Sequence, residues 1–233
     1  MLTVCSTAQP QGRRRVLAAA ALIAVCGWAA APAQAAEPIK IGLVTALSGQ
    51  SALAGESITR GISVAIDEIN AKGGLLGGRP LELVRRDDEG NPAKGVSAAR
   101  ELIHREKVAV LFGGLDTPVA TAIVPLVNQS KTPFMVPWAA GTPITRNGAK
   151  PNYAFRVSAV DEIVDVAMLD YAQASFGAKK PGMILVNNPW GESNERGLRA
   201  AMTAKQVELA GVEKFEANDV DVVPQLTRLK AAG

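Results

Sequence analysis

The sequence predicts an α/β protein with two doubly wound lobes, each built on a parallel sheet, the second lobe being incomplete. Short runs rich in β-branched residues alternate with longer segments in which apolar residues recur at helical spacing. That alternation is typical of a parallel sheet covered by helices on both faces. The series stops at a segment rich in Gly, Pro and Asn, residues 147–152 (NGAKPN), and then starts again.

The first lobe is predicted to span residues 36–150. Two of its helices begin at Asn91-Pro92 and Thr117-Pro118, because proline is favoured in the first turn of a helix. A third helix is expected over residues 56–71, where isoleucines recur at helical spacing. The predicted strands are residues 39–45, 81–85, 108–112 and 134–136.

The second lobe is predicted to occupy residues 151–233. Its predicted helices are residues 161–175, 192–209 and 224–232. Its predicted strands are residues 182–187 and 212–215, and residues 153–157 are expected to form a strand or a crossover. The chain stops where a further strand should follow, so we expect a C-terminally truncated piece of a longer protein that binds ligand weakly by itself. The alternative is a short, complete protein with a reduced second lobe.

Residues 1–35 have the pattern of a cleaved export signal. Arg13 to Arg15 form a basic region, residues 16–25 are apolar, and residues 33–35 (AQA) have the small-x-small form of a cleavage site. The arginines also resemble a twin-arginine export motif. The alternatives are an uncleaved anchor helix and, weakly, a lipoprotein attached through Cys26. A cleaved signal predicts a periplasmic protein.

Charge and cysteine content exclude several functions for the rest of the chain. Three of the 25 basic residues lie in the leader, so the remaining 22 balance the 22 acidic residues. The chain has no block or stripe of basic residues of the kind that binds nucleic acid, so we expect no nucleic-acid partner. Both cysteines, Cys5 and Cys26, lie in the leader. The body is therefore predicted to have no disulfide, no thiol nucleophile and no cysteine metal site.

The loops after the strands are the predicted ligand-binding region, because ligands of open parallel sheets bind beyond the carboxyl ends of the strands. These loops are residues 46–55, 113–117, 136–142 and 187–191. The helix that begins near Thr117 directs free N–H groups at whatever lies beside that residue, which suits a carboxylate. We expect the glycines of these loops to leave backbone amides accessible; they are Gly49, Gly113, Gly114 and Gly141.

Two tryptophans stand out in a chain with only 4% aromatic residues. Trp138 follows the fourth predicted strand of the first lobe, and Trp190 follows the first clear strand of the second lobe. We interpret them as opposing walls of a cleft between the lobes. The alternative is that both are ordinary packing residues near helix starts.

Several motifs resemble those of branched-chain amino acid binding proteins of the type I periplasmic fold. They are residues 40–49 (KIGLVTALSG), 70–74 (NAKGG), 78–80 (GRP), 87–92 (DDEGNP) and 152–156 (NYAFR). The similarity runs from about residue 38 to the end of the chain. Members of that family are longer, which agrees with the expected truncation.

The resemblance implies the roles of individual residues. Ser48 and Gly49 would line the cleft, Thr117 would hold the ligand carboxylate, and Trp190 would cover the ligand where the family usually has Tyr. Groups after the fourth strand would contribute too; these are Trp138, Ala139 and Ala140. Ala54 stands where an aromatic residue can occur, and the family's acidic residue for the ligand amino group would lie beyond Gly233. The ligand class therefore stays open between an amino acid and a bulky or aromatic carboxylate.

The predicted function is that of a solute-binding protein of an ABC importer, clamping its ligand between two lobes. The predicted partners are the small-molecule ligand and a membrane permease, and we expect a monomer without a cofactor or metal. The alternatives are a ligand-sensing receptor domain and an α/β enzyme. Enzymatic motifs are lacking: His104 is the only histidine, and no Gly-x-Ser-x-Gly or phosphate loop occurs. We interpret residues 87–89 (DDE) as a loop end and helix-cap region.

Overall fold

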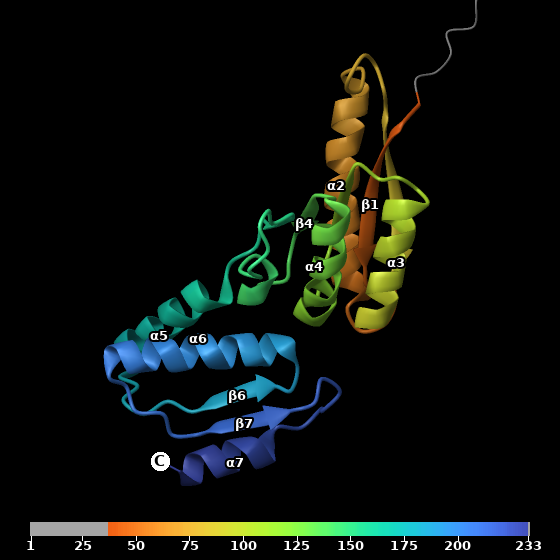
Figure 1. Cartoon of the computed structure of the whole chain (residues 1–233). Helices are drawn as coiled ribbons and strands as arrows, with labels where there is room; N and C mark the ends of the chain where they lie inside the picture. Colours follow the sequence, from red (N-terminus) through yellow and green to blue (C-terminus); the bar gives the residue numbers. More distant parts are fainter. Residues whose placement is uncertain (1–36, 233) are drawn as a thin grey trace, which may run out of the picture. The chain divides into compact units, whose positions relative to one another are not determined.

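Five parallel strands form the larger sheet of the computed structural model, which describes residues 37–232 (Figure 1). The strand order is β2-β1-β3-β4-β5, and every neighbouring pair is parallel. The strands are β1 (Ile39–Thr45), β2 (Leu81–Asp87), β3 (Val110–Gly113), β4 (Phe134–Val136) and β5 (Ala154–Arg156). The carboxyl ends of these strands all lie at one edge of the sheet, because all five run the same way.

Three helices connect these strands: α2 (Ala52–Ala71), α3 (Pro92–His104) and α4 (Thr117–Ser130). The chain moves one way along the sheet from β1 to β2 and the other way from β2 to β3 and β4. Right-handed crossovers therefore place α2 on one face and α3 and α4 on the other. α3 and α4 pack against each other, and α2 contacts β2 (Figure 1). A short 3-10 helix, η1 (Thr142–Ile144), follows β4.

The main core lies between the sheet and the helices α3 and α4. Phe134, Leu102, Leu111 and Ile123 are fully buried there. Their enclosure explains why the β-branched and leucine-rich runs form strands and helices here, since apolar burial is the main favourable contribution to folding. Other members of the core include Val44, Ala99, Val119, Val127, Val136 and Ile144.

A second, two-stranded parallel sheet follows, formed by β6 (Met183–Val186) and β7 (Val212–Phe215). The helices of this part are α5 (Asp161–Phe176), α6 (Pro189–Lys205) and α7 (Val223–Ala231). α5 packs along α6, and α7 contacts β7. A smaller core joins these elements; its buried residues are Leu169, Met183, Leu185, Ala201 and Met202. The predicted α/β class with parallel sheets is confirmed.

Asparagine caps fix the starts of two helices. The Asn91 side chain accepts hydrogen bonds from the backbone N–H groups of Ala93 and Lys94, which starts α3 where the sequence predicted. The Asn188 side chain accepts from the N–H groups of Trp190 and Gly191 in the same way. Each cap satisfies amide groups that a helix start otherwise leaves without partners.

Two predicted helices have wrong boundaries. α2 begins at Ala52 instead of residue 56, so the loop after β1 is shorter than predicted. α6 spans Pro189–Lys205 instead of residues 192–209. Its start was missed because Asn188 followed by Pro189 was interpreted as loop, although the pair acts as Asn91-Pro92 does. Its end comes earlier because Gln206 adopts a left-handed conformation with φ of 55°.

β5 belongs to the first sheet, where it pairs with β4 through Phe134 and Ala154. The sheet of the first lobe therefore extends past residue 150, at which we placed the end of that lobe. The sequence left residues 153–157 open between a strand and a crossover, and the structure shows a short strand. The export signal, its cleavage site and the cysteines lie outside the described residues.

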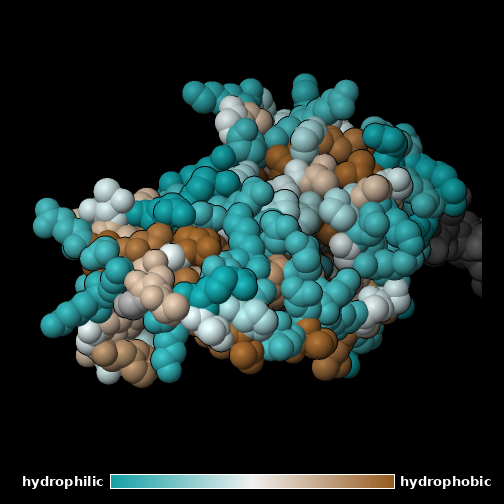
Figure 2. Space-filling model, turned by 90° about the horizontal axis from the view of Figure 1, so that it is seen from below, coloured by the Kyte–Doolittle hydropathy of each residue, from teal (hydrophilic) through white to brown (hydrophobic). Residues whose placement is uncertain are grey.

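Hydrophobic side chains are not confined to the cores. Figure 2 shows patches of hydrophobic residues among hydrophilic ones on the face that it views. The large exposed hydrophobic side chains include several on α5, namely Ile163, Met168, Tyr171 and Phe176. Among residues 37–232, no helix has the length and apolar character needed to cross a membrane.

Candidate functional site

A pocket of about 510 Å³ lies at the carboxyl ends of β1, β3 and β4. The start of α4 and the start of α6 also border it, so both sheets contribute to its walls. Its lining mixes small, hydroxyl, amide, acidic and aromatic residues: Ala46, Ser48, Gln50, Ser51, Glu89, Gly90, Leu115, Asp116, Thr117, Pro118, Trp138, Ala139, Ala140, Asn188, Trp190, Ala217 and Asn218. This is the position at which open α/β sheets bind ligands.

The structure brings most of the predicted site residues together in this pocket. The six that line it are Ser48, Thr117, Trp138, Ala139, Ala140 and Trp190. Gly49 is not part of the lining. It forms a turn with φ of 75°, and its carbonyl accepts a hydrogen bond from Ala52. That these residues contact a ligand stays a prediction.

Thr117 lies at the first position of α4 and is only 3% exposed. Its Oγ1 accepts a hydrogen bond of 3.2 Å from the backbone N–H of Gly141. A hydroxyl has one donor besides its acceptor sites, so the O–H of Thr117 stays available for a ligand oxygen. The preceding residue, Asp116, does not cap the helix with its side chain. The first amides of α4 are therefore not satisfied by a cap, and they favour an anion.

Three of the four loop glycines serve close packing, which corrects the expectation that they leave amides accessible. A Cβ on Gly113 would lie 2.5 Å from the carbonyl oxygen of Val44 in the neighbouring strand. A Cβ on Gly114 would lie 2.6 Å from Ala120 Cβ, and one on Gly141 would lie 2.3 Å from Thr117 Cγ2. These glycines let the strand ends and the start of α4 approach one another, which shapes the pocket wall.

Both predicted aromatic residues contribute to the pocket without being buried in a core. Trp138 is 65% exposed and Trp190 is 48% exposed. Trp190 sits in the first turn of α6, where its amide is held by Asn188 at 2.9 Å. Exposed large aromatic side chains in a concave site are typical of ligand contact surfaces. Their exposure favours the cleft-wall interpretation over ordinary packing.

Asp87 orders the loop that carries Ser48. Its Oδ1 accepts hydrogen bonds from the backbone N–H of Leu47 at 2.9 Å and of Glu89 at 2.8 Å. Burial raises the pKa of Asp87, but hydrogen bonds from Ser48, Leu47 and Glu89 outweigh it and hold the pKa below its usual value. The carboxylate thus remains ionised and keeps the loop in place, in agreement with a loop-end role for residues 87–89.

Sequence reasoning missed the acidic residues of the pocket, Asp116 and Glu89. Asp116 directly precedes Thr117-Pro118, and we interpreted that segment only as a helix start. Burial raises the pKa of Asp116. Glu89 pairs with Lys94 at 2.6 Å, and this pair is about half-exposed. Among residues 37–232, no group of three or more His, Cys, Asp or Glu is arranged to hold a metal ion.

A larger cavity of about 840 Å³ lies beside β6 and α5. It shares Trp138, Ala140 and Trp190 with the polar pocket, but its lining is mostly apolar and includes the core residues Leu169, Met183, Leu185 and Met202 of the second sheet. A small carboxylate needs hydrogen-bond donors when it is taken out of water. We therefore assign the candidate site to the smaller, polar pocket.

The fold and the pocket define a class of protein: an α/β protein with a polar pocket at the carboxyl ends of its parallel strands. The chain belongs to the periplasmic binding protein family, whose model matches residues 38–233. The resemblance inferred from the motifs is confirmed.

Three relatives illustrate the family. The chain is 27% identical over 219 residues to Leu/Ile/Val-binding protein homolog 3 of Brucella melitensis biotype 1, covering 94% of this chain and 58% of the relative. It is 30% identical to an ABC transporter solute binding protein from R. palustris in complex with 4-hydroxybenzoate, with a TM-score of 0.73, covering 84% of this chain and 52% of the other. It is 25% identical to a branched-chain amino acid transporter substrate binding protein from Streptococcus pneumoniae in complex with isoleucine, with a TM-score of 0.69, covering 83% and 54%. The chain thus spans little more than half the length of these proteins.

Proposed function

We propose that the protein is an extracytoplasmic solute-binding protein of an ABC importer. Its ligand would be an amino acid of the branched-chain type or a related small carboxylate. The observation that carries this proposal is the meeting of Thr117, the uncapped start of α4 and two exposed tryptophans in one pocket. The relatives whose titles name isoleucine and 4-hydroxybenzoate support a small carboxylate ligand.

In the proposed mechanism, the ligand carboxylate lies against the first turn of α4. The amides there and the O–H of Thr117 donate hydrogen bonds to it, and the partial positive charge of the helix start adds to the attraction. Ala139 and Ala140 leave room for the ligand beside them, while Trp138 and Trp190 cover its apolar part. Ser48, which the Asp87 hydrogen bonds help to position, completes the wall on the β1 side.

Binding is proposed to shift a population of conformers towards the one in which both sheets contact the ligand. A ligand favours such a conformer only through contacts that other conformers lack. The pocket meets this condition because its walls come from both parts of the chain: Thr117 from α4 and Trp190 from α6. Several hydrogen bonds join the two parts, among them those from the Thr142 N–H to Ser193 Oγ at 3.0 Å and from the Asp161 N–H to the carbonyl oxygen of Ala140 at 2.9 Å.

The rest of the assignment follows from this role. The ligand-bound conformer would be recognised by a membrane permease, and the protein would act as a monomer in the periplasm. The export-signal pattern of residues 1–35 supports that location. We propose binding without chemical turnover and without a cofactor, because the pocket offers hydrogen-bond donors, acids and aromatic walls but neither histidine nor cysteine.

The role of Thr117 is tested by replacing it with Val, which keeps the shape of the side chain and removes the hydroxyl. Losing a hydrogen bond to a charged group should weaken leucine binding by about 1–3 kcal/mol, which is about 5- to 150-fold. Titration calorimetry measures the change, with 4-hydroxybenzoate as a second ligand. Thr121→Val is the matched control, because Thr121 lies one turn further along α4, does not line the pocket, and bonds through its hydroxyl only to carbonyls of its own helix.

Equal dissociation constants for Thr117→Val and the unaltered protein, with both variants folded, would show that Thr117 does not hold the carboxylate. If neither leucine nor 4-hydroxybenzoate binds the unaltered protein at tens of millimolar, the proposed ligand class is wrong.

A further inference from the structure

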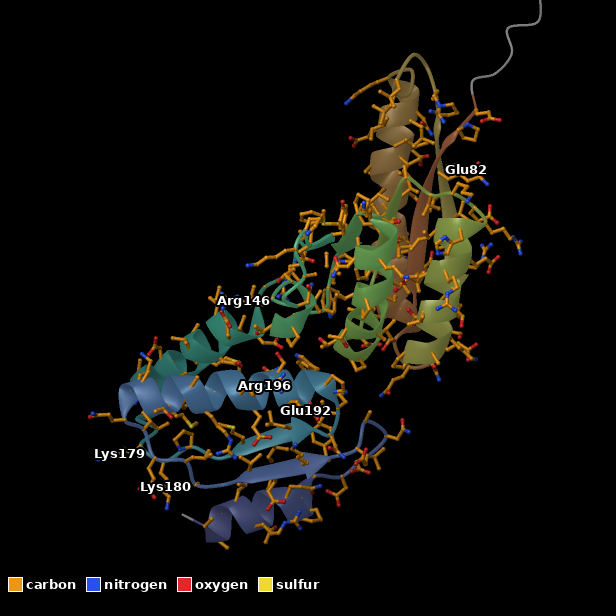
Figure 3. The ribbon with its side chains drawn as sticks, in the orientation of Figure 1. Glu82, Arg146, Lys179, Lys180, Glu192 and Arg196 are labelled. Carbon is orange, nitrogen blue, oxygen red and sulfur yellow. The ribbon has the colours of Figure 1, made fainter. Side chains whose placement is uncertain are left out.

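The charged residues that line the pocket are all acidic. Two acidic residues, Asp116 and Glu89, belong to its lining, and none of its lining residues is Lys, Arg or His. The basic residues labelled in Figure 3 also lie elsewhere: none of them lines this pocket, and they are Arg146, Lys179, Lys180 and Arg196. A ligand that carries only a negative charge would thus meet carboxylates and no basic side chain.

Asp116 is the acid whose charge is uncompensated. Its side chain does not cap α4, and none of the ion pairs within residues 37–232 includes it. It lies against Gly90, on which a Cβ would be 3.5 Å from Asp116 Oδ2. Glu89 differs, because its carboxylate pairs with Lys94 at 2.6 Å. Asp116 therefore dominates the electrostatic character of the pocket.

A second carboxyl makes the local field more negative. Asp88 is 1% exposed, and its Oδ2 has no hydrogen-bond partner. Burial is the main cause that raises the pKa of Asp88 to about 6; the Gly90 amide opposes this, and the charges of Asp116 and Asp87 add to it. Asp88 and Asp116 thus repel each other at the edge of the site. A cation bound beside them would relieve that repulsion.

We propose that Asp116 provides the negative counter-charge for an ammonium group of the ligand, so that the pocket selects an amine-bearing carboxylate over a plain carboxylate of the same shape. This inference rests on the proposed function and narrows its ligand class. It assigns to Asp116 a specificity-determining role in the pocket.

The two charges of an α-amino acid match two adjacent features of the chain. The amides at the start of α4 and the O–H of Thr117 suit the carboxylate, while Asp116, one residue earlier, suits the ammonium. Both charged groups of an α-amino acid are attached to one carbon, so neighbouring positions on the protein suffice. A plain carboxylate would gain the same donors but would also face Asp116 without compensation, which lowers its affinity.

The test compares leucine with 4-methylpentanoate, which is leucine without its amino group. The full chain carries three tryptophans, so Trp28→Phe leaves only Trp138 and Trp190. NMR titration of their two indole N–H resonances then reports binding at the pocket even at millimolar dissociation constants. We expect leucine to bind at least about tenfold more tightly than 4-methylpentanoate, the effect of one charged hydrogen bond.

Asp116→Asn should weaken leucine binding and strengthen 4-methylpentanoate binding, so that the two affinities come within about twofold of each other. Glu82→Gln is the control, because it removes one negative charge from an exposed position on β2 that does not line the pocket (Figure 3). Glu82→Gln should leave the ratio of the leucine and 4-methylpentanoate affinities unchanged.

The outcomes separate the inference from the proposed function. If both ligands shift the indole resonances with equal affinity in the unaltered pocket, the inference fails while the proposed function stands. If neither ligand shifts them but 4-hydroxybenzoate does, the inference fails alone. If none of the three shifts them, the proposed function fails and the inference with it. If Asp116→Asn does not fold, the two affinities measured in the unaltered pocket decide the question. A ratio of these affinities near one overturns the inference.

Discussion

Asp165 shows how a single residue can set the pH dependence of the second lobe. It lies on α5 with a fully buried side chain, and neither carboxylate oxygen has a hydrogen-bond partner. Burial, followed by the charge of Asp161, raises the pKa of Asp165 to about 7. Unfolding returns this pKa to its usual value near 4, so the folded state holds one proton more than the unfolded state between these values. Stability should therefore fall as pH rises from about 4 to about 7.

Asp165→Asn removes the ionisable group and keeps its shape. We expect this variant to be more stable than the unaltered protein at pH 8 by about 1–3 kcal/mol, and to lose that advantage near pH 4. Urea unfolding at several pH values measures the effect. Asp170→Asn is the control, because Asp170 lies on the same helix but is exposed and pairs with Lys205. A stability difference for Asp165→Asn that does not vary with pH would contradict this account.

Among the residues that line the pocket, those in local sequence motifs could be predicted, while those that only the fold brings together could not. Thr117, Trp138 and Trp190 could be predicted because each directly follows a strand or begins a helix. Gly49 was misplaced, because the earlier start of α2 shortens its loop into a turn. Asp116 could not be assigned, because its missing cap bond and its place beside Gly90 and Asp88 depend on contacts distant in the sequence.

At the scale of elements, close contacts at glycines decide how helices meet their neighbours. A Cβ on Gly55 of α2 would lie 1.8 Å from the carbonyl oxygen of Ala46, and one on Gly191 of α6 would lie 1.9 Å from that of Val186. Each glycine brings the start of a helix close to the end of the preceding strand. The same arrangement thus recurs after β1 and after β6, and the loops that follow these two strands both contribute to the pocket lining.

The packing of α5 on α6 depends on Gly197 in the same way. A Cβ there would lie 1.9 Å from Asp165 Oδ2 and 3.2 Å from the Cα of Glu162. Gly197→Ala should therefore destabilise the protein by about 1–3 kcal/mol, although alanine is the better helix former.

Gly61→Ala is the matched comparison on α2. A Cβ on Gly61 would have nothing within 4 Å, so this variant should gain about 0.5–1 kcal/mol from helix propensity. Chemical denaturation of both variants measures the difference. Equal effects of the two substitutions would show that the α5–α6 contact does not require glycine.

Elements differ in how well the sequence predicts them. α3 and β1 were predicted with their starts because Asn91-Pro92 and a compact run rich in β-branched residues are local signals. The start of α6 carries the same kind of cap, Asn188 followed by Pro189, and the structure shows that it has the same effect. The pairing of β5 with β4 could not be predicted, because Ala154–Arg156 is too short to show a period and its partner is fixed by the sheet.

At the scale of the whole molecule, the order of strands and helices was enough to predict the fold class and the edge of the sheet that carries the pocket. The charge of the pocket was not predictable, because it depends on which side chains converge there. The family assignment rests on residues 38–233, and the relatives bind, by their titles, both an amino acid and an aromatic acid. The central claim is that the polar pocket between Thr117 and Trp190 is where this chain binds such a ligand.

Intrinsic fluorescence of the Trp28→Phe chain tests that claim most directly, because both remaining tryptophans line the pocket. We expect leucine or isoleucine to change the emission saturably, and Trp190→Phe to remove most of that change while the protein stays folded. An emission spectrum that no branched-chain amino acid alters at tens of millimolar, in a chain that unfolds cooperatively on heating, would contradict the account.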